Sequence, residues 1–77
     1  MYFRFNQNDT MRKAMNAFWT EQKANGQQLT PFDSFSSREG ECRVSHGGDN
    51  TPFEAFLIRN SYSFEKTDVS LMDEYNR

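Results

Sequence analysis

The residues best suited to chemistry gather in one segment, residues 38–49. It contains the only His and the only Cys of the chain, His46 and Cys42, and two arginines, Arg38 and Arg43. A histidine has the unperturbed pKa nearest neutrality, so it can serve as a general base, and an arginine can hold an anionic group. This combination supports one functional hypothesis, a small hydrolase or nuclease centred on His46.

The local structure expected for this segment argues against catalysis. Residues 41–46 alternate in polarity, which predicts a strand with Cys42, Val44 and His46 on one face. Residues four apart on a strand are roughly 13 Å apart, too far for His46 to activate Cys42 directly. The glycines Gly47 and Gly48 match neither phosphate-loop pattern and predict a turn. We therefore expect no catalytic residue, with Cys42 as a small buried core residue.

The same segment is also a poor candidate for a metal site. A finger-type zinc site needs four Cys or His ligands, and this chain has one of each. Cys42, His46 and Asp49 would require a further ligand from elsewhere in the chain. We expect neither a metal nor a cofactor.

The N-terminal residues predict the first strand of the fold. Phe3 and Phe5 alternate with Tyr2 and Arg4, and this period of two is typical of a strand. The two Phe rings are expected to face the core. The side chains of Tyr2 and Arg4 are then expected to face solvent or a partner.

The next segment predicts a long helix over residues 9–25. The segment Asn8-Asp9-Thr10 offers capping side chains, and Gly26 can adopt the left-handed conformation that ends a helix. Helical spacing places one stripe of residues on a single face, with Trp19 beside it. The stripe consists of Met11, Ala14, Met15, Phe18 and Gln22.

A short pattern, T-P-F-[DE]-x-F, occurs at residues 30–35 and again at residues 51–56. Thr can cap a helix, Pro fits its first position, and an acidic residue can reach back to the cap amide. We expect a single helical turn at the first copy. The second copy predicts a helix to Asn60, and a strand over residues 53–60 is the alternative.

The last part of the chain predicts a strand and a short helix. Residues 61–65 alternate in polarity, and Thr67-Asp68 can cap a helix that holds Val69, Leu71, Met72 and Tyr75. No linker divides the chain, which predicts a single domain over residues 1–77. The expected fold is α+β, with the long helix packed on a small, mostly antiparallel sheet and short capped helical turns.

The apolar composition is unusual because aromatic residues outnumber branched aliphatic ones. The chain has 8 Phe, 3 Tyr and 1 Trp. Its Leu, Ile and Val residues are only Leu29, Leu57, Leu71, Ile58, Val44 and Val69. A net charge of −2 and 16% aromatic residues argue against disorder. Spacing predicts core positions for Phe3, Phe5, Phe18, Phe32, Phe35, Phe53 and Phe56.

The charge distribution bears on the class of partner. Residues 1–25 carry a net charge of +2 and residues 26–77 a net charge of −4. An acidic total argues against nucleic acid as the main partner, because neutralising phosphates needs clustered Lys and Arg. A small nucleic-acid-binding protein remains the alternative, and it would use Arg4, Arg12, Lys13 and Lys23.

The hydropathy of the chain and its single Cys favour a cytoplasmic protein. The chain has no apolar run long enough to span a membrane, and its first residues do not resemble a secretory signal, so we expect no membrane contact. A single Cys cannot form an internal disulfide, which fits a reducing compartment. A phage or mobile-element accessory protein that inhibits a larger host protein would have this size.

The function that the sequence favours is a non-enzymatic protein-binding module. Large rings left at the surface of a small domain are typical interface anchors, and they would bind a larger protein or a second copy of the chain. The expected contacts are aromatic or basic residues with an acidic rim. They are Tyr2, Arg4, Trp19, Tyr62 and Tyr75, with Asp68, Asp73 and Glu74.

Overall fold

A four-stranded antiparallel sheet forms the centre of the fold, in the order β2-β3-β1-β4. The computed structural model describes residues 1–75, apart from the side chain of Tyr75. In chain order the elements are β1 (Tyr2–Phe5), α1 (Asn8–Ala24), β2 (Phe32–Ser36), β3 (Gly40–Val44), the 3₁₀ turn η1 (Ser45–Gly47), α2 (Thr51–Arg59), β4 (Glu65–Thr67) and α3 (Leu71–Tyr75). The predicted α+β class is confirmed.

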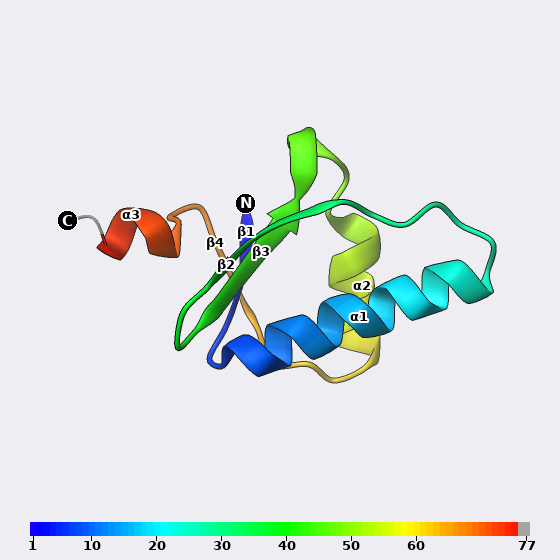
Figure 1. The fold of residues 1–77 in the computed structure, drawn as a ribbon, viewed down its shortest axis with the longest axis horizontal. Coiled ribbons are helices and arrows are strands. Elements are labelled where there is room, and N and C mark those ends of the chain that lie inside the picture. The colour runs from blue at the N-terminus through cyan, green and yellow to red at the C-terminus, as the bar shows by residue number, and fades with distance from the viewer. Residues whose placement is uncertain (76–77) are drawn as a thin grey trace.

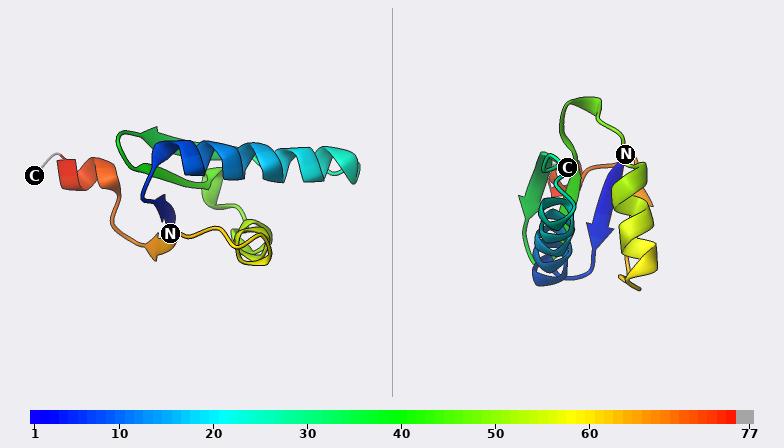
Figure 2. Two further views of the ribbon diagram at one scale, coloured as in Figure 1. Left: turned by 90° about the horizontal axis from the view of Figure 1, so that it is seen from below. Right: turned by 90° about the vertical axis from the view of Figure 1, so that its right-hand side faces the viewer.

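The helices are distributed unequally over the two faces of the sheet. Helices α1 and α2 lie on one side of the sheet, and the short α3 lies on the other (Figures 1 and 2). The molecule measures 42 × 24 × 17 Å, because α1 extends beyond one end of the sheet and α3 beyond the other (Figure 1). Within residues 1–75 there is no helix whose length and hydropathy would let it span a bilayer.

Aromatic rings fill the space between the sheet and its two helices. The side chains of Phe3, Phe5, Phe18, Phe53 and Phe56 are buried. The ring centroid of Phe53 lies 5.1 Å from that of Phe3 and 5.2 Å from that of Phe18, both in edge-on geometry. Such pairs add about 0.5–1.5 kcal/mol each beyond the area that they bury. The predicted use of Phe for the core is thus confirmed for these five rings.

Two of the predicted core rings behave differently. Phe32 is half-buried and packs on the edge of the core, 4.8 Å from Phe53 between ring centroids. Phe35 does not join the core cluster, because it pairs with Glu41 and so faces the other side of the sheet. Paired residues in antiparallel strands point to the same face, and Glu41 lies next to the buried Cys42. The prediction for Phe35 is therefore wrong.

Helix α1 has the predicted stripe and end but not the predicted start. Its buried residues are Met11, Ala14, Met15, Phe18 and Gln22. At its C-terminus Gly26 has φ 70°, and Gln27 N donates to Gln22 O at 2.8 Å, which is a Schellman motif. At its N-terminus the cap residue is Gln7, and no side chain caps the helix. The predicted capping by Asn8, Asp9 and Thr10 is wrong, because all three are already helical.

The two copies of the T-P-F pattern adopt different structures. The second copy forms α2, with Pro52 in its first turn, so the helix is confirmed over the strand alternative. The first copy contributes β2, and the predicted helical turn there is wrong. Ser45 N donates to Pro31 O at 2.9 Å, so pairing with the β3 side overrides the local preference of residues 30–35. Tertiary pairing routinely outweighs such weak local signals.

Two predicted strands end or begin elsewhere. Strand β3 ends at Val44, and the chain turns through η1, where His46 has φ 59°. His46 is therefore exposed in a turn and does not share a strand face with Cys42 and Val44. The strand predicted at residues 61–65 is displaced to Glu65–Thr67, because the chain first turns at Ser61, which has φ 60°.

Gly40 lies where the first turns of α1 are in close contact with the sheet. A Cβ atom at this position would lie 2.8 Å from Met11 Cβ and 3.0 Å from the backbone Cα of Asn8. Neither neighbour can swing away, since one is backbone and the other is attached directly to it. Gly40 is thus a buried strand residue that lets the helix lie on the sheet.

We expect the substitution Gly40→Ala to lower the free energy of unfolding by about 1–3 kcal/mol, the usual cost of overpacking. Urea denaturation followed by circular dichroism measures this change. The matched control is Ser36→Ala, because Ser36 pairs with Gly40 across the β2–β3 ladder and is exposed. The control should change stability by less than about 0.5 kcal/mol. Equal stability of both variants would contradict the close contact.

Candidate functional site

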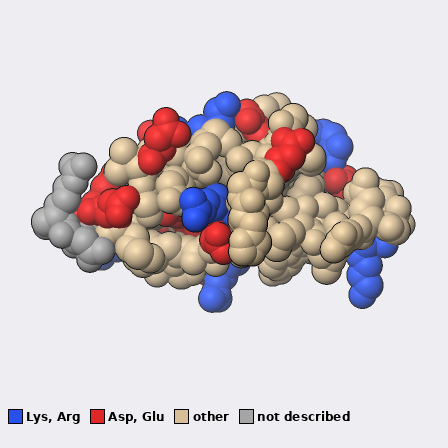
Figure 3. Space-filling model, turned by 90° about the horizontal axis from the view of Figure 1, so that it is seen from above, with Lys and Arg blue, Asp and Glu red and all other residues tan. Residues whose placement is uncertain are grey.

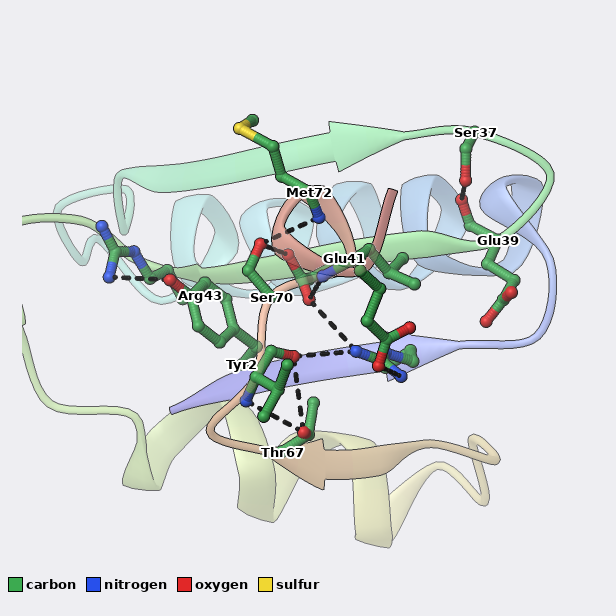
Figure 4. A network of polar contacts seen from close by, with 12 residues as sticks. Tyr2, Ser37, Glu39, Glu41, Arg43, Thr67, Ser70 and Met72 are labelled. Atoms are coloured by element: carbon green, nitrogen blue, oxygen red, sulfur yellow. Dashed lines mark hydrogen bonds and ion pairs between the residues drawn. The ribbon is translucent and has the colours of Figure 1, made fainter. Parts of the chain in front are cut away.

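The candidate site is the side of the sheet that α1 and α2 do not cover, which we call the open face. It carries the side chains of Tyr2 and Arg4 from β1, Glu41 and Arg43 from β3, and Phe35 from β2. These five residues share a face because β1 and β2 both pair with β3 in register. Figure 4 shows this face, with α1 behind the sheet.

The C-terminal segment is fastened to the open face through Glu41. The side chain of Glu41 is buried, and its carboxylate accepts hydrogen bonds from Ser70 Oγ at 2.9 Å and from Leu71 N at 2.8 Å (Figure 4). Ser70 Oγ also accepts a hydrogen bond from Met72 N at 3.1 Å, and Leu71 is only 2% exposed. Glu41 thus fixes the start of α3 against the centre of the sheet.

Arg4 provides the positive charge for this attachment. Its guanidinium donates to Val69 O at 2.8 Å and to Glu74 Oε1 at 3.2 Å, and it lies 3.9 Å from Glu41 Oε1. The Arg4 side chain is only 15% exposed. The two terminal nitrogens of Arg4 thus link β1 to the segment that leads into α3, whereas its buried Nε has no hydrogen-bond partner among the described residues.

A second chain of contacts crosses the open face nearer to β2. The guanidinium carbon of Arg43 lies 5.2 Å from the centroid of the Tyr2 ring, and Arg43 Nε lies 3.5 Å from Asp33 Oδ2. Asp33 Oδ1 also accepts a hydrogen bond from Ser45 Oγ at 2.9 Å. Arg43 and Asp33 are about half exposed, so their ion pair adds little to stability. Both charged groups can still meet a partner.

Between these two sets of contacts lies a groove of about 250 Å³, which we call the open-face groove. Its residues are Tyr2, Asp33, Ser34, Phe35, Glu41, Arg43, Ser70, Met72 and Asp73. Three of them are acidic and one is basic, and Met72 on its rim is 50% exposed. The groove combines aromatic and thioether surface with an acidic border. In Figure 3 acidic side chains occur at the end of the molecule that carries α3 and also further along the same face, with Lys and Arg side chains between them.

The structure brings together some of the predicted contact residues and places others apart. Tyr2 and Asp73 line the open-face groove, and Arg4 contacts Glu74 beside it. Asp68 is exposed in the turn before α3. The side chain of Tyr75 lies outside the described part of the chain. For this group the predicted role in binding stays a prediction.

Trp19 and Tyr62 lie on the helix side of the sheet, away from the open face. Both are half-buried and pack on the core. Trp19 Nε1 donates to Thr30 O at 2.7 Å, and the Tyr62 ring stacks at 6.1 Å from that of Phe56. Their rings therefore have structural contacts already, although each keeps some exposed surface.

Phe35, Glu41 and Arg43 line the open-face groove, although none of them is among the contact residues predicted from the sequence. The missing signal was strand β2, because a strand over residues 32–36 would have placed Phe35 across from Glu41. The alternation in residues 41–44 already placed Arg43 on the face opposite Cys42. Combining the two would have identified the aromatic and charged residues of the groove.

The two groups considered for catalysis differ in their exposure to solvent. Cys42 is fully buried, and burial raises the pKa of its thiol to about 12, with a further contribution from the Glu41 charge. His46 is exposed in η1. Among the described residues no group of three or more His, Cys, Asp and Glu side chains could hold a metal ion.

The basic residues of the nucleic-acid alternative do not form one surface. Arg12, Lys13 and Lys23 are exposed on α1, whereas Arg4 is on the open face, held by the segment at α3. The sheet separates Arg4 from the other three.

No family model, curated protein or solved structure matches this chain.

We expect Glu41→Ala to lower the free energy of unfolding by about 2–3 kcal/mol, because two buried donors would lose a charged acceptor. Urea denaturation measures the loss, and hydrogen exchange should show increased exchange at residues 70–75. The control Glu65→Ala removes an exposed carboxylate from β4 on the same face and should have little effect. If α3 stayed protected in Glu41→Ala, the attachment through Glu41 would be refuted.

The burial of the Cys42 thiol leads to a separate prediction. Because the pKa of Cys42 is raised to about 12, the folded protein should react negligibly with a thiol reagent at neutral pH. The unfolded chain should react at the rate of an ordinary cysteine. The raised pKa also means that stability falls as the pH rises above 9.0, where only the unfolded chain loses this proton. Rapid labelling of the folded protein would contradict the burial of Cys42.

Proposed function

We propose that this protein is a protein-binding module that holds a basic segment of a larger protein in the open-face groove. The observation that carries the proposal is the groove itself, with Tyr2 and Phe35 in its walls and Asp33 and Asp73 among its acidic residues. A lysine or arginine side chain has an apolar stem and a charged end, and such a groove complements both.

The charges near the groove favour a basic partner. Glu41 is balanced by Arg4 and by its two hydrogen-bond donors, and Asp33 is paired with Arg43. Asp73 is exposed on α3, close to the exposed Met72. An incoming cation would meet Asp73 first and could then compete with Arg43 for Asp33. Tyr2 supplies a ring of the kind that is enriched at the centre of protein interfaces.

The proposed compartment and the proposed inhibitory role rest on the sequence and on the size of the chain. A single buried Cys fits a protein that works in the reducing cytoplasm. A 77-residue domain that binds a larger protein without a catalytic group of its own is suited to inhibition. We therefore propose an inhibitor, of the kind that phages and mobile elements encode against host proteins, as the form that this binding takes.

The test is affinity capture from host lysate, quantified by mass spectrometry, with wild-type protein and three variants. Tyr2→Ala and Asp73→Lys should each reduce capture of the partner at least tenfold, as expected for an interface anchor and a reversed charge. Asp9→Lys makes the same charge change at an exposed site on α1 and should leave capture unchanged.

The captured partner should also elute as the salt concentration rises, because the attraction is partly between exposed charges. The proposal fails if the same proteins are retained equally by wild type, Tyr2→Ala and Asp73→Lys. It also fails if Asp9→Lys alone abolishes capture, since α1 would then be the binding surface.

A further inference from the structure

We propose that the outer edge of β2 pairs antiparallel with β2 of a second copy, so that two molecules share one continuous sheet. This inference concerns the edge of the sheet and does not depend on what the open-face groove binds. It follows from the backbone geometry of β2, from the contrast with the other edge strand, and from the pattern of side chains along β2.

The backbone of β2 presents unused hydrogen-bonding groups to solvent. Ser45 N donates to Pro31 O, and Ser37 N donates to Glu39 O, both at 2.9 Å. These bonds extend the β2–β3 register at its two ends, and bonded pairs alternate in an antiparallel ladder. Asp33 and Phe35 therefore bond to β3, and the residues between and beside them point their N–H and C=O groups outward. These are Phe32, Ser34 and Ser36.

No other part of residues 1–75 covers this backbone with hydrogen bonds. The backbone hydrogen bonds outside the helices and the sheet reach Pro31 and Ser37, but none of them involves Phe32, Ser34 or Ser36. An exposed strand edge of this kind is a template for pairing with another strand. In the ribbon views β2 is the outermost strand on its side (Figure 2).

The two edges of the sheet differ in how well they resist pairing. Strand β4, at the other edge, has three residues, of which Glu65 and Lys66 are exposed and charged. Short length and charge are the usual protection of an edge. Strand β2 has five residues, and Asp33 is the only charged one among them. The edge at β2 is therefore longer and less charged than the edge at β4.

The sequence of β2 is complementary to that of a second copy related to it by a twofold axis. An antiparallel pair centred on Ser34 places Ser34 opposite Ser34 of the second copy, and Phe32 opposite Ser36. On the open face it places Asp33 opposite Phe35. No like charges face each other directly, and each Phe has a small or polar residue opposite, so the pairing has no steric or electrostatic conflict.

Helix α1 adds a second complementary surface beside the strand. A groove of about 280 Å³ separates α1 from β2, and Arg12, Trp19 and Ser34 are among its lining residues. Asn8, near the start of α1, lies over Gly40, and Trp19 lies beside Phe32. The twofold axis at Ser34 therefore directs Arg12 of one copy toward Trp19 of the other, where a cation and an indole attract each other.

Analytical ultracentrifugation over a range of concentrations tests the pairing. Wild-type protein should sediment as a dimer of the 9.1 kDa chain. Ser34→Pro should weaken the dimer roughly tenfold to a hundredfold, because it removes the two central hydrogen bonds. Proline is tolerated where the N–H of an edge strand faces solvent, so circular dichroism should show an unchanged fold.

The matched control is Lys66→Pro on the other edge. In the ladder of β1 and β4, Lys66 also has its backbone groups outward, because Tyr2 bonds to Thr67 and Arg4 to Glu65. This variant should dimerise like wild type. A dimer that resists Ser34→Pro, or one that only Lys66→Pro abolishes, would overturn the assignment to β2.

A charge exchange at Ser34 tests the register. Ser34→Lys and Ser34→Glu should each weaken their own dimer about fivefold, because like charges would lie directly opposite each other. An equimolar mixture of the two variants should dimerise at least as well as wild type. A mixture no better than either variant alone would overturn the pairing of Ser34 with itself. A wild-type protein that stays monomeric at every concentration would overturn the proposal altogether, and β2 would then be an edge for a different partner.

Discussion

The distance between α1 and β3 at Gly40 is the constraint on which the rest of this structure depends. With no side chain at residue 40, the first turns of α1 lie directly on the sheet, and Met11 is buried there. The helix then continues along the sheet so that Phe18 reaches the rings of Phe53 and Phe56. A helix held further away would leave a gap between these aromatic layers that no side chain could fill.

Helices α1 and α2 both pack on one face of the sheet. The contacts on the open face are therefore mostly polar. The short α3 buries Leu71, and hydrogen bonds to Glu41 and Arg4 hold the rest of its attachment. Buried charges are costly unless they are paired and hydrogen-bonded, and here each charge has such partners. The part of the open face around Glu41 and Arg4 is therefore held in place by these hydrogen bonds. That order lowers the conformational cost of binding a partner there.

The elements that could be predicted from the sequence are those in which local pattern and tertiary structure agree. Helix α1 follows from its stripe and from Gly26, and β1 follows from the alternation of Phe3 and Phe5. Strand β2 could not be predicted in the same way, because residues 30–35 carry the same capping pattern that forms α2. Only pairing with β3, across a short turn, decides between the two conformations.

The candidate site was predictable only in part, for a related reason. Tyr2 and Asp73 could be chosen as polar or amphipathic residues at the margins of elements, and both line the groove. Phe35 and Glu41 enter the site through the β2–β3 register, which no local pattern reveals. Trp19 was predicted as a partner contact because its ring lies at the margin of the helical stripe. In the structure the carbonyl of Thr30, in a loop, accepts a hydrogen bond from this ring instead.

The position of β1 has a consequence for the way this chain folds. Phe3 pairs with Cys42 on one side and with Lys66 on the other, so the first strand of the sequence lies inside the sheet between two later ones. Closing such long loops costs chain entropy before their contacts can form, which slows folding relative to a helical domain of equal size. Helix α1 and the β2–β3 hairpin are local and can form early. The sheet becomes complete only when β4 arrives, and until then one edge of β1 remains open to intermolecular pairing.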